Sequence, residues 1–77
     1  MKESVMLVNT VKVDDTYSVM VVPLADEYEC YGKKHTETGS TPFMYMFGVD
    51  PLTTSLCEAV NLAIANVPFY DDMFEGE

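Results

Sequence analysis

The amino-acid sequence predicts an α+β fold: an antiparallel sheet of three to four strands, in the order β-β-β-β-α, followed by an acidic-aromatic tail. The single C-terminal amphipathic helix is expected to pack on one face of the sheet. Three observations favour this fold. Apolar residues alternate with period two early in the chain, both faces are apolar after residue 42, and a helical period follows residue 55. The 77 residues allow one domain, 1–77.

The first two strands are predicted to form a hairpin. Residues 5–13 and 16–24 both alternate in material rich in β-branched side chains, and Asp14 and Asp15 between them favour a short turn. Pro23 has no N–H to donate to a neighbouring strand. The second strand is therefore expected to end near Pro23 or to lie at an edge there.

The next segments predict a short strand, a loop and a long strand. Residues 26–32 alternate acids with aromatic or thiol side chains, which indicates a third strand with one charged face. Residues 33–42 are polar and lack a period, so they are expected to form a loop. The strand at 43–49 is expected to place Phe43, Tyr45, Phe47 and Val49 on one face and Met44, Met46 and Gly48 on the other.

The helix has two alternative starts. Asp50 with Pro51 suits an N-terminal cap, and Ser55 with Glu58 forms a second candidate, a capping box. Pro68 is expected to end the helix within about a residue. The apolar stripe expected to pack on the sheet consists of Leu56, Val60, Ala63, Ile64 and Val67.

The final segment, 69–77, mixes three aromatic residues and a methionine with four carboxylates. It could fold back as an edge strand or a helical turn, or stay loose and dock in a basic groove as a peptide. The sequence leaves these alternatives open.

Residues that support catalysis or cofactor binding are sparse. His35 is expected to be a solvated side chain of the polar loop, and Cys30 and Cys57 match no metal or redox spacing and are expected to be buried thiols. The acids lack the spacing of a calcium-binding loop, and the glycines do not cluster as in a phosphate site. We therefore predict a protein that is not an enzyme and that holds no metal and no cofactor.

Charge is the most informative property of the chain. Four lysines, no arginine and 13 acids give a net charge of −9. This balance disfavours direct binding to nucleic acid and favours a basic protein partner. The longest apolar run covers seven residues, 19–25, whereas a membrane-spanning helix needs about 20. The N-terminus does not read as a secretory signal, so a cytoplasmic protein is expected, in the host cytoplasm if a phage encodes it.

In size, acidity and strand-then-helix order, the chain resembles the broad class of small phage-encoded inhibitors that includes anti-CRISPR proteins and DNA mimics. That class has no common motif, so the resemblance assigns no residue. The charge favours an inhibitor that fills the basic nucleic-acid-binding groove of a host protein. The residues expected to contact it are the acids Asp26, Glu27, Glu29, Asp71, Asp72 and Glu75 and the aromatic anchors Tyr28, Tyr31, Tyr70 and Phe74.

This interpretation requires the third strand and the tail to lie on a common rim, where their carboxylates would form one negative stripe. The alternative is a small assembly module that forms a homodimer or docks through an apolar, methionine-rich sheet face. Met20, Met44 and Met46 would form that face, because methionine adapts to irregular partner surfaces.

Overall fold

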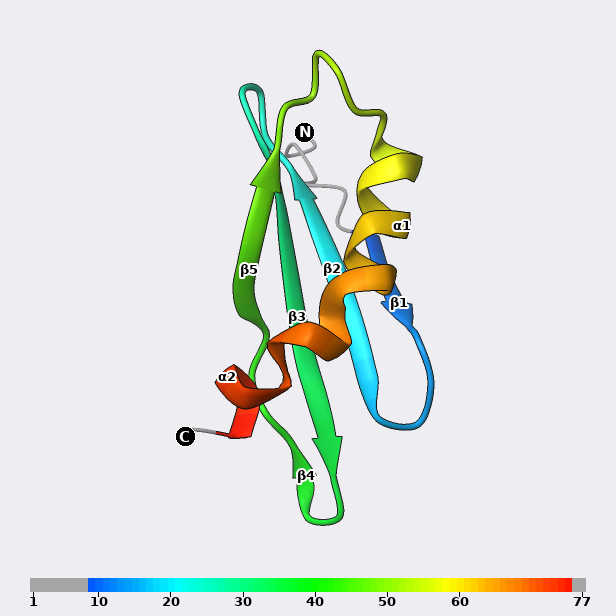
Figure 1. The fold of residues 1–77 in the computed structure, drawn as a ribbon, viewed down its shortest axis with the longest axis vertical. Coiled ribbons are helices and arrows are strands. Elements are labelled where there is room, and N and C mark those ends of the chain that lie inside the picture. The colour runs from blue at the N-terminus through cyan, green and yellow to red at the C-terminus, as the bar shows by residue number, and fades with distance from the viewer. Residues whose placement is uncertain (1–8, 76–77) are drawn as a thin grey trace, which may run out of the picture.

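The computed structural model describes residues 9–75 and confirms the predicted α+β fold, with a five-stranded antiparallel sheet and its helical segments on one side (Figure 1). The order in the sheet is β1-β2-β3, and β3 then pairs with both β4 and β5. The elements are β1 (Asn9–Lys12), β2 (Tyr17–Pro23), β3 (Tyr28–Thr36), β4 (Gly39–Ser40), β5 (Met44–Val49), α1 (Leu56–Asn66), the 3₁₀ segment η1 (Val67–Tyr70) and α2 (Asp71–Glu75).

The predicted first hairpin is confirmed between β1 and β2. Its turn closes on Asp14, whose carboxylate accepts hydrogen bonds from the backbone N–H groups of Thr16 (2.8 Å) and Tyr17 (2.9 Å). These two bonds lower the pKa of Asp14. β2 ends at Pro23, as expected. Residues 5–8 of the predicted first strand lie outside the described part of the chain.

The prediction of a loop at residues 33–42 is wrong for residues 33–36, which belong to β3. β3 continues through Lys33, Lys34 and His35 to Thr36 and turns back into β4. These polar residues are held in the strand by pairing with β2, where Tyr17 lies opposite Lys34. Their side-chain partners come from other elements, and local sequence does not indicate them.

A bulge changes the faces expected of β5. Cys30 pairs with Phe47 and Tyr31 pairs with Tyr45, so one step along β3 matches two steps along β5, with Met46 as the additional residue. Met46 is buried and Phe47 packs against the core, while Tyr45 remains exposed. The predicted common face of Tyr45 and Phe47 is therefore wrong.

The helix starts at the second predicted cap. Ser55 accepts a hydrogen bond from the Glu58 N–H, and Glu58 accepts one from the Ser55 N–H, which completes the capping box. Asp50 instead closes a separate turn, where its carboxylate accepts the Leu52 N–H. α1 ends just before η1, in which Pro68 occupies the first turn, as expected from its missing N–H.

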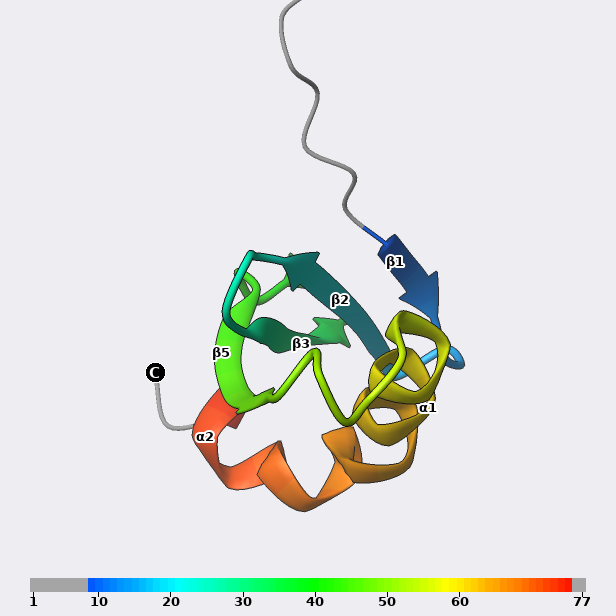
Figure 2. The same cartoon turned by 90° about the horizontal axis from the view of Figure 1, so that it is seen from above.

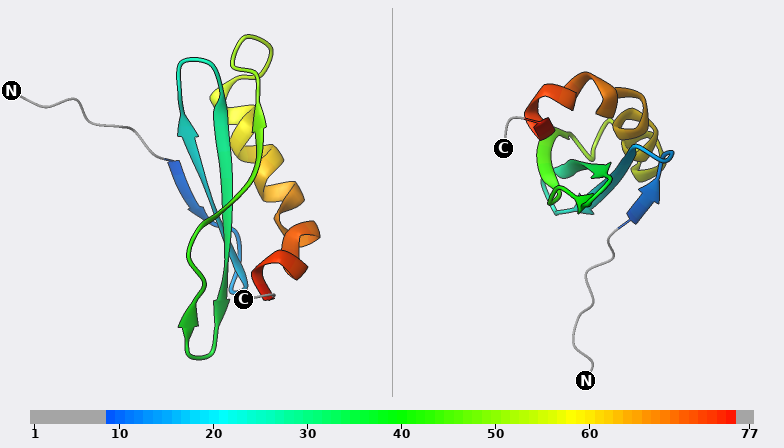
Figure 3. Two further views of the ribbon diagram at one scale, coloured as in Figure 1. Left: turned by 90° about the vertical axis from the view of Figure 1, so that its left-hand side faces the viewer. Right: turned by 90° about the horizontal axis from the view of Figure 1, so that it is seen from below.

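The core lies between the sheet and the helical layer. α1, η1 and α2 follow one another along one side of a curved sheet, and the opposite face carries none of these helices (Figures 2 and 3). Leu56, Val60 and Ile64 of the predicted stripe are half-buried against this core. The buried apolar residues are Val19, Val21, Cys30, Met46, Ala59, Ala63, Val67 and Phe74.

The acidic-aromatic tail is helical where it is described, which selects one of the alternatives left open by the sequence. Phe74 is 1% exposed, and its ring lies 6.4 Å from that of Tyr17. Gly32 of β3 leaves room for it, because a Cβ at Gly32 would approach Phe74, Val67 and Met46 to 2.8–3.0 Å. The tail is thus anchored over the middle of β3.

Candidate functional site

The open face of the sheet carries one compact group of acids and tyrosines. Side chains alternate along a strand, so Glu29 and Tyr31 point to the open face while Cys30 between them points to the helices. Glu27 precedes this strand, and Tyr45 comes from β5. We call Glu27, Glu29, Tyr31 and Tyr45 the acidic tyrosine cluster.

Hydrogen bonds and ring contacts fix the geometry of the acidic tyrosine cluster. The Tyr31 hydroxyl donates to Glu29 Oε1 at 2.9 Å, and the Tyr45 hydroxyl donates to Glu27 Oε2 at 2.9 Å. The two rings meet edge to face, with centroids 5.7 Å apart and an angle of 80°. Four side chains from three segments of the chain therefore support one another on an open surface.

Two features of β5 build this cluster. The bulge at Met46 brings Tyr45 opposite Tyr31. Gly48 lies opposite Glu29, and a Cβ there would collide with the carboxyl group of Glu27, so the missing side chain lets Glu27 cross the strand to Tyr45. The sequence pattern did not indicate Tyr45 as a site residue, because its position depends on the bulge.

The acids of the cluster shape its electrostatics. The hydrogen bond to Glu29 raises the pKa of Tyr31, and the bond to Glu27 raises the pKa of Tyr45, since each bond favours the neutral phenol. Both phenols therefore stay protonated donors at neutral pH. A carboxylate has about four lone-pair positions, so each glutamate can still accept hydrogen bonds from a partner's Lys or Arg.

Two more acids lie at the same end of the sheet. Asp26 belongs to the turn between β2 and β3, and Asp50 directly follows β5. The pairing of Tyr28 with Val49 joins the start of β3 to the end of β5, so both acids lie beside the acidic tyrosine cluster. We call Asp26, Asp50 and this cluster together the acidic end.

The lysines of the described chain lie away from the acidic end. Lys12 and Lys33 both lie on the rung of Ser18, where β1, β2 and β3 pair. Lys33 lies four positions along β3 from Glu29, a distance of about 13 Å. Lys33 Nζ also lies 4.7 Å from the centre of the Phe43 ring. Within residues 9–75, charge on the sheet is therefore divided between an acidic end and a more basic middle.

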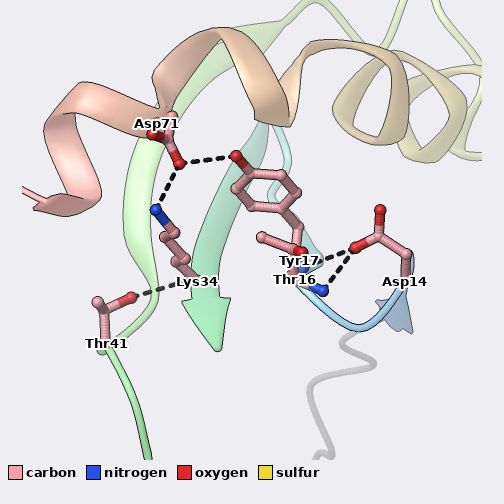
Figure 4. Close-up of polar contacts among 6 residues, drawn as sticks. All are labelled: Asp14, Thr16, Tyr17, Lys34, Thr41 and Asp71. Atoms are coloured by element: carbon pink, nitrogen blue, oxygen red, sulfur yellow. Dashed lines mark hydrogen bonds and ion pairs between the residues drawn. The ribbon is translucent and has the colours of Figure 1, made fainter. Parts of the chain in front are cut away.

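Asp71 of the tail does not join the acidic end. Asp71 of α2 lies on the helical side of the sheet, where Lys34 Nζ approaches it to 2.9 Å and the Tyr17 hydroxyl donates to it at 2.7 Å (Figure 4). Lys34 lies five residues beyond Glu29 on β3 and points to the opposite face. The expected single stripe of third-strand and tail carboxylates is therefore not formed.

The structure also separates the expected aromatic anchors. Tyr31 is on the open face, but Phe74 is buried in the core. Tyr28 and Tyr70 are half-buried and pack against the core, and the Tyr70 ring lies 6.1 Å from that of Phe47. Of the remaining predicted contacts, Asp72 is exposed on α2, and the side chain of Glu75 lies outside the described part of the structure.

Two expectations about reactive side chains are wrong. His35 is not on a solvated loop: its Nε2 lies 2.8 Å from the Ser18 hydroxyl on the neighbouring strand. Cys30 is buried, and burial raises the pKa of its thiol to about 11, but Cys57 is exposed on α1. The described residues contain no group of three or more His, Cys, Asp or Glu that could hold a metal ion.

The predicted methionine-rich face is not formed as one surface. Met46 is buried, and Met44 packs against the core on the helical side. Met20 pairs with Tyr31 and lies on the open face. The three side chains are thus divided between the two sides of the sheet.

Comparisons with protein-family models, with curated proteins and with solved structures give no significant match to this chain. Within the described segment, no helix has both the length and the apolar character needed to cross a bilayer.

Proposed function

We propose that this protein is a non-enzymatic inhibitor that inserts its acidic end into the basic nucleic-acid-binding groove of a host protein. The observation that carries the proposal is the acidic end itself, in which the four residues of the acidic tyrosine cluster hold one another in place beside Asp26 and Asp50. Within residues 9–75, no lysine lies at that end. A CRISPR effector, a restriction enzyme or a polymerase has a groove of the required charge.

The two kinds of side chain have separate tasks. The carboxylates, together with the net charge of −9, accelerate the encounter with a basic surface and fix its orientation. Tyr31 and Tyr45 offer flat surfaces that contribute contact energy once water is expelled. Because these side chains already hold one another in place, binding costs less side-chain entropy than ordering them would.

The placement of the polar residues favours binding over catalysis. The Ser18 hydroxyl beside His35 belongs to a residue that is 5% exposed, so a substrate has little access to it. Catalysis requires a nucleophile and a base that both reach a substrate. We therefore propose an inhibitor of the kind represented by anti-CRISPR proteins and DNA mimics, acting in the cytoplasm, or in the host cytoplasm if a phage encodes it.

Capture from a host lysate, followed by competition, tests this function. The immobilised protein is exposed to lysate at about 50 mM salt, and bound proteins are eluted with duplex DNA or with a gradient to about 200 mM salt. We expect DNA and salt to release the same nucleic-acid-binding protein, because both compete for its basic groove. Retention that neither DNA nor salt weakens would contradict the proposal.

A further inference from the structure

The helical layer has a second surface, on the side that faces away from the sheet. Five exposed residues follow one another there at intervals of four, three, four and three positions: Glu58, Leu62, Ala65, Phe69 and Asp72. Within α1 this spacing places Glu58, Leu62 and Ala65 on one side of the helix. The exposed Phe69 of η1 and Asp72 of α2 follow where the helical layer turns (Figure 1). We call these residues the outer helix stripe.

The centre of the outer helix stripe is apolar and unusually open. Phe69 is 81% exposed and Leu62 is 41% exposed, although both are large hydrophobic side chains. Ala65 between them is small, so a partner backbone can approach closely. Large exposed apolar groups that lie together on a small protein commonly mark a contact surface.

A shallow depression adjoins the stripe at Leu62. It has a volume of about 420 Å³ and is lined by Thr54, Glu58, Asn61 and Leu62. The Glu58 carboxylate on its rim is held in place, because it accepts the Ser55 N–H at 3.0 Å in the capping box. The depression thus combines an apolar wall with a positioned negative charge.

Charge decides which partner suits the stripe. An acid stands at each end, Glu58 before Leu62 and Asp72 after Phe69, and residues 56–75 contain no Lys, Arg or His. A second copy fits poorly, since the acids of its stripe would find no cation among residues 56–75 of the other copy. Each copy also carries a net charge of −9. A helix with an apolar face and flanking Lys or Arg complements both the centre and the ends.

We propose that the outer helix stripe is a second docking surface, which binds a basic amphipathic helix of a partner protein. Apolar side chains of that helix cover Leu62 and Phe69, and its cations pair with Glu58 and Asp72. The helical layer lies on one side of the sheet (Figure 2), and the alternation of side chains along β3 places Glu29 and Tyr31 on the other side. The sheet and the core therefore separate this surface from the acidic end. The protein can therefore contact two basic elements at once.

The test uses a synthetic leucine–lysine peptide of about 15 residues that forms an amphipathic helix. A peptide of the same composition in scrambled order serves as its control. Affinity is measured by calorimetry, and contacts are mapped from backbone amide shifts. We expect the patterned peptide to bind more tightly than the scrambled one and to shift amides of residues 58–72.

Two exposed apolar side chains give a matched pair of variants. Phe69→Ser removes the most exposed apolar side chain of the stripe, whereas Leu52→Ser removes a side chain that is 91% exposed but lies outside it. We expect Phe69→Ser to weaken peptide binding by about tenfold or more and Leu52→Ser to change it by less than about twofold. In Glu58→Gln, which keeps the capping box, the salt dependence of binding should fall.

Several results would overturn this inference. They are equal binding of both peptides, equal effects of Phe69→Ser and Leu52→Ser, amide shifts confined to β3 and β5, or self-association abolished by Phe69→Ser. Amide shifts confined to β3 and β5 would mean that the peptide binds the acidic end, which agrees with the proposed function but not with this inference. The other outcomes concern Phe69 and Leu52, which lie outside the acidic end. Conversely, a partner captured through the acidic end should bind Phe69→Ser as well as the wild type.

Discussion

At the scale of single residues, the two cysteines show how position determines chemistry. Cys57 is exposed on α1, whereas Cys30 is fully buried in β3, with its thiol 3.9 Å from the Ala59 carbonyl oxygen. Burial disfavours the charged thiolate and raises the pKa of Cys30 from 9.0 to about 11. The folded protein therefore holds this proton more tightly than the unfolded chain does.

This difference predicts a loss of stability at alkaline pH. Between pH 9 and about 11 the unfolded chain releases the Cys30 proton while the folded protein retains it, so the free energy of unfolding falls as pH rises. The raised pKa values of Tyr17, Tyr31 and Tyr45 act in the same direction. Urea unfolding across this range should show a shallower loss in Cys30→Ala and an unchanged loss in Cys57→Ala. If the free energy of unfolding fell equally steeply with pH in Cys30→Ala and Cys57→Ala, burial of the Cys30 thiol would not be the cause of the loss.

At the scale of elements, the strands and the helix were predictable because their patterns are local. Period-two alternation identified β2 and β5, and the capping box with the helical stripe identified α1. The second half of β3 and the bulge in β5 were not predictable. Both depend on neighbours that are distant in sequence, such as Tyr17 opposite Lys34. The conformation of the tail was not predictable for the same reason, since the space for Phe74 is provided by Gly32, which is distant in sequence.

Two glycines on opposite faces of the sheet test how the tail is anchored. In Gly32→Ala the new methyl group meets Val67, Met46 and Phe74 in the core, and we expect a loss of about 1–3 kcal/mol in the free energy of unfolding. Gly48→Ala meets only the flexible side chain of Glu27, and a change below about 0.5 kcal/mol is expected. Urea unfolding measures both.

Hydrogen exchange provides a second observable for this pair. Gly32→Ala should also speed amide exchange in η1 and α2, because these segments pack over the substituted position. Gly48→Ala should leave exchange in the tail unchanged. The anchoring account would be wrong if Gly32→Ala were as stable as the wild type with the same exchange in the tail.

At the scale of the whole molecule, the sequence determines the net charge, but the predicted positions of the acids were only partly correct. Asp26, Glu27, Glu29 and Tyr31 do lie together, because they are close in sequence, in the turn before β3 and at the start of that strand. Asp71 lies on the other side of the sheet beside Lys34. Composition gives the sum of charges, but the pairing of strands decides which charges become neighbours.

A comparison of two charge-matched variants tests whether the position of the carboxylates, and not only the net charge, determines binding to the partner. Glu27→Gln with Glu29→Gln removes two carboxylates from the acidic end, and Asp15→Asn with Glu37→Gln removes two exposed carboxylates from turns at the other end of the sheet. The dissociation constant for the captured partner is measured at about 50 mM salt. The account predicts about tenfold weaker binding or more for the first pair and less than about twofold for the second. Equal weakening by both pairs would contradict it, because only the net charge would then matter.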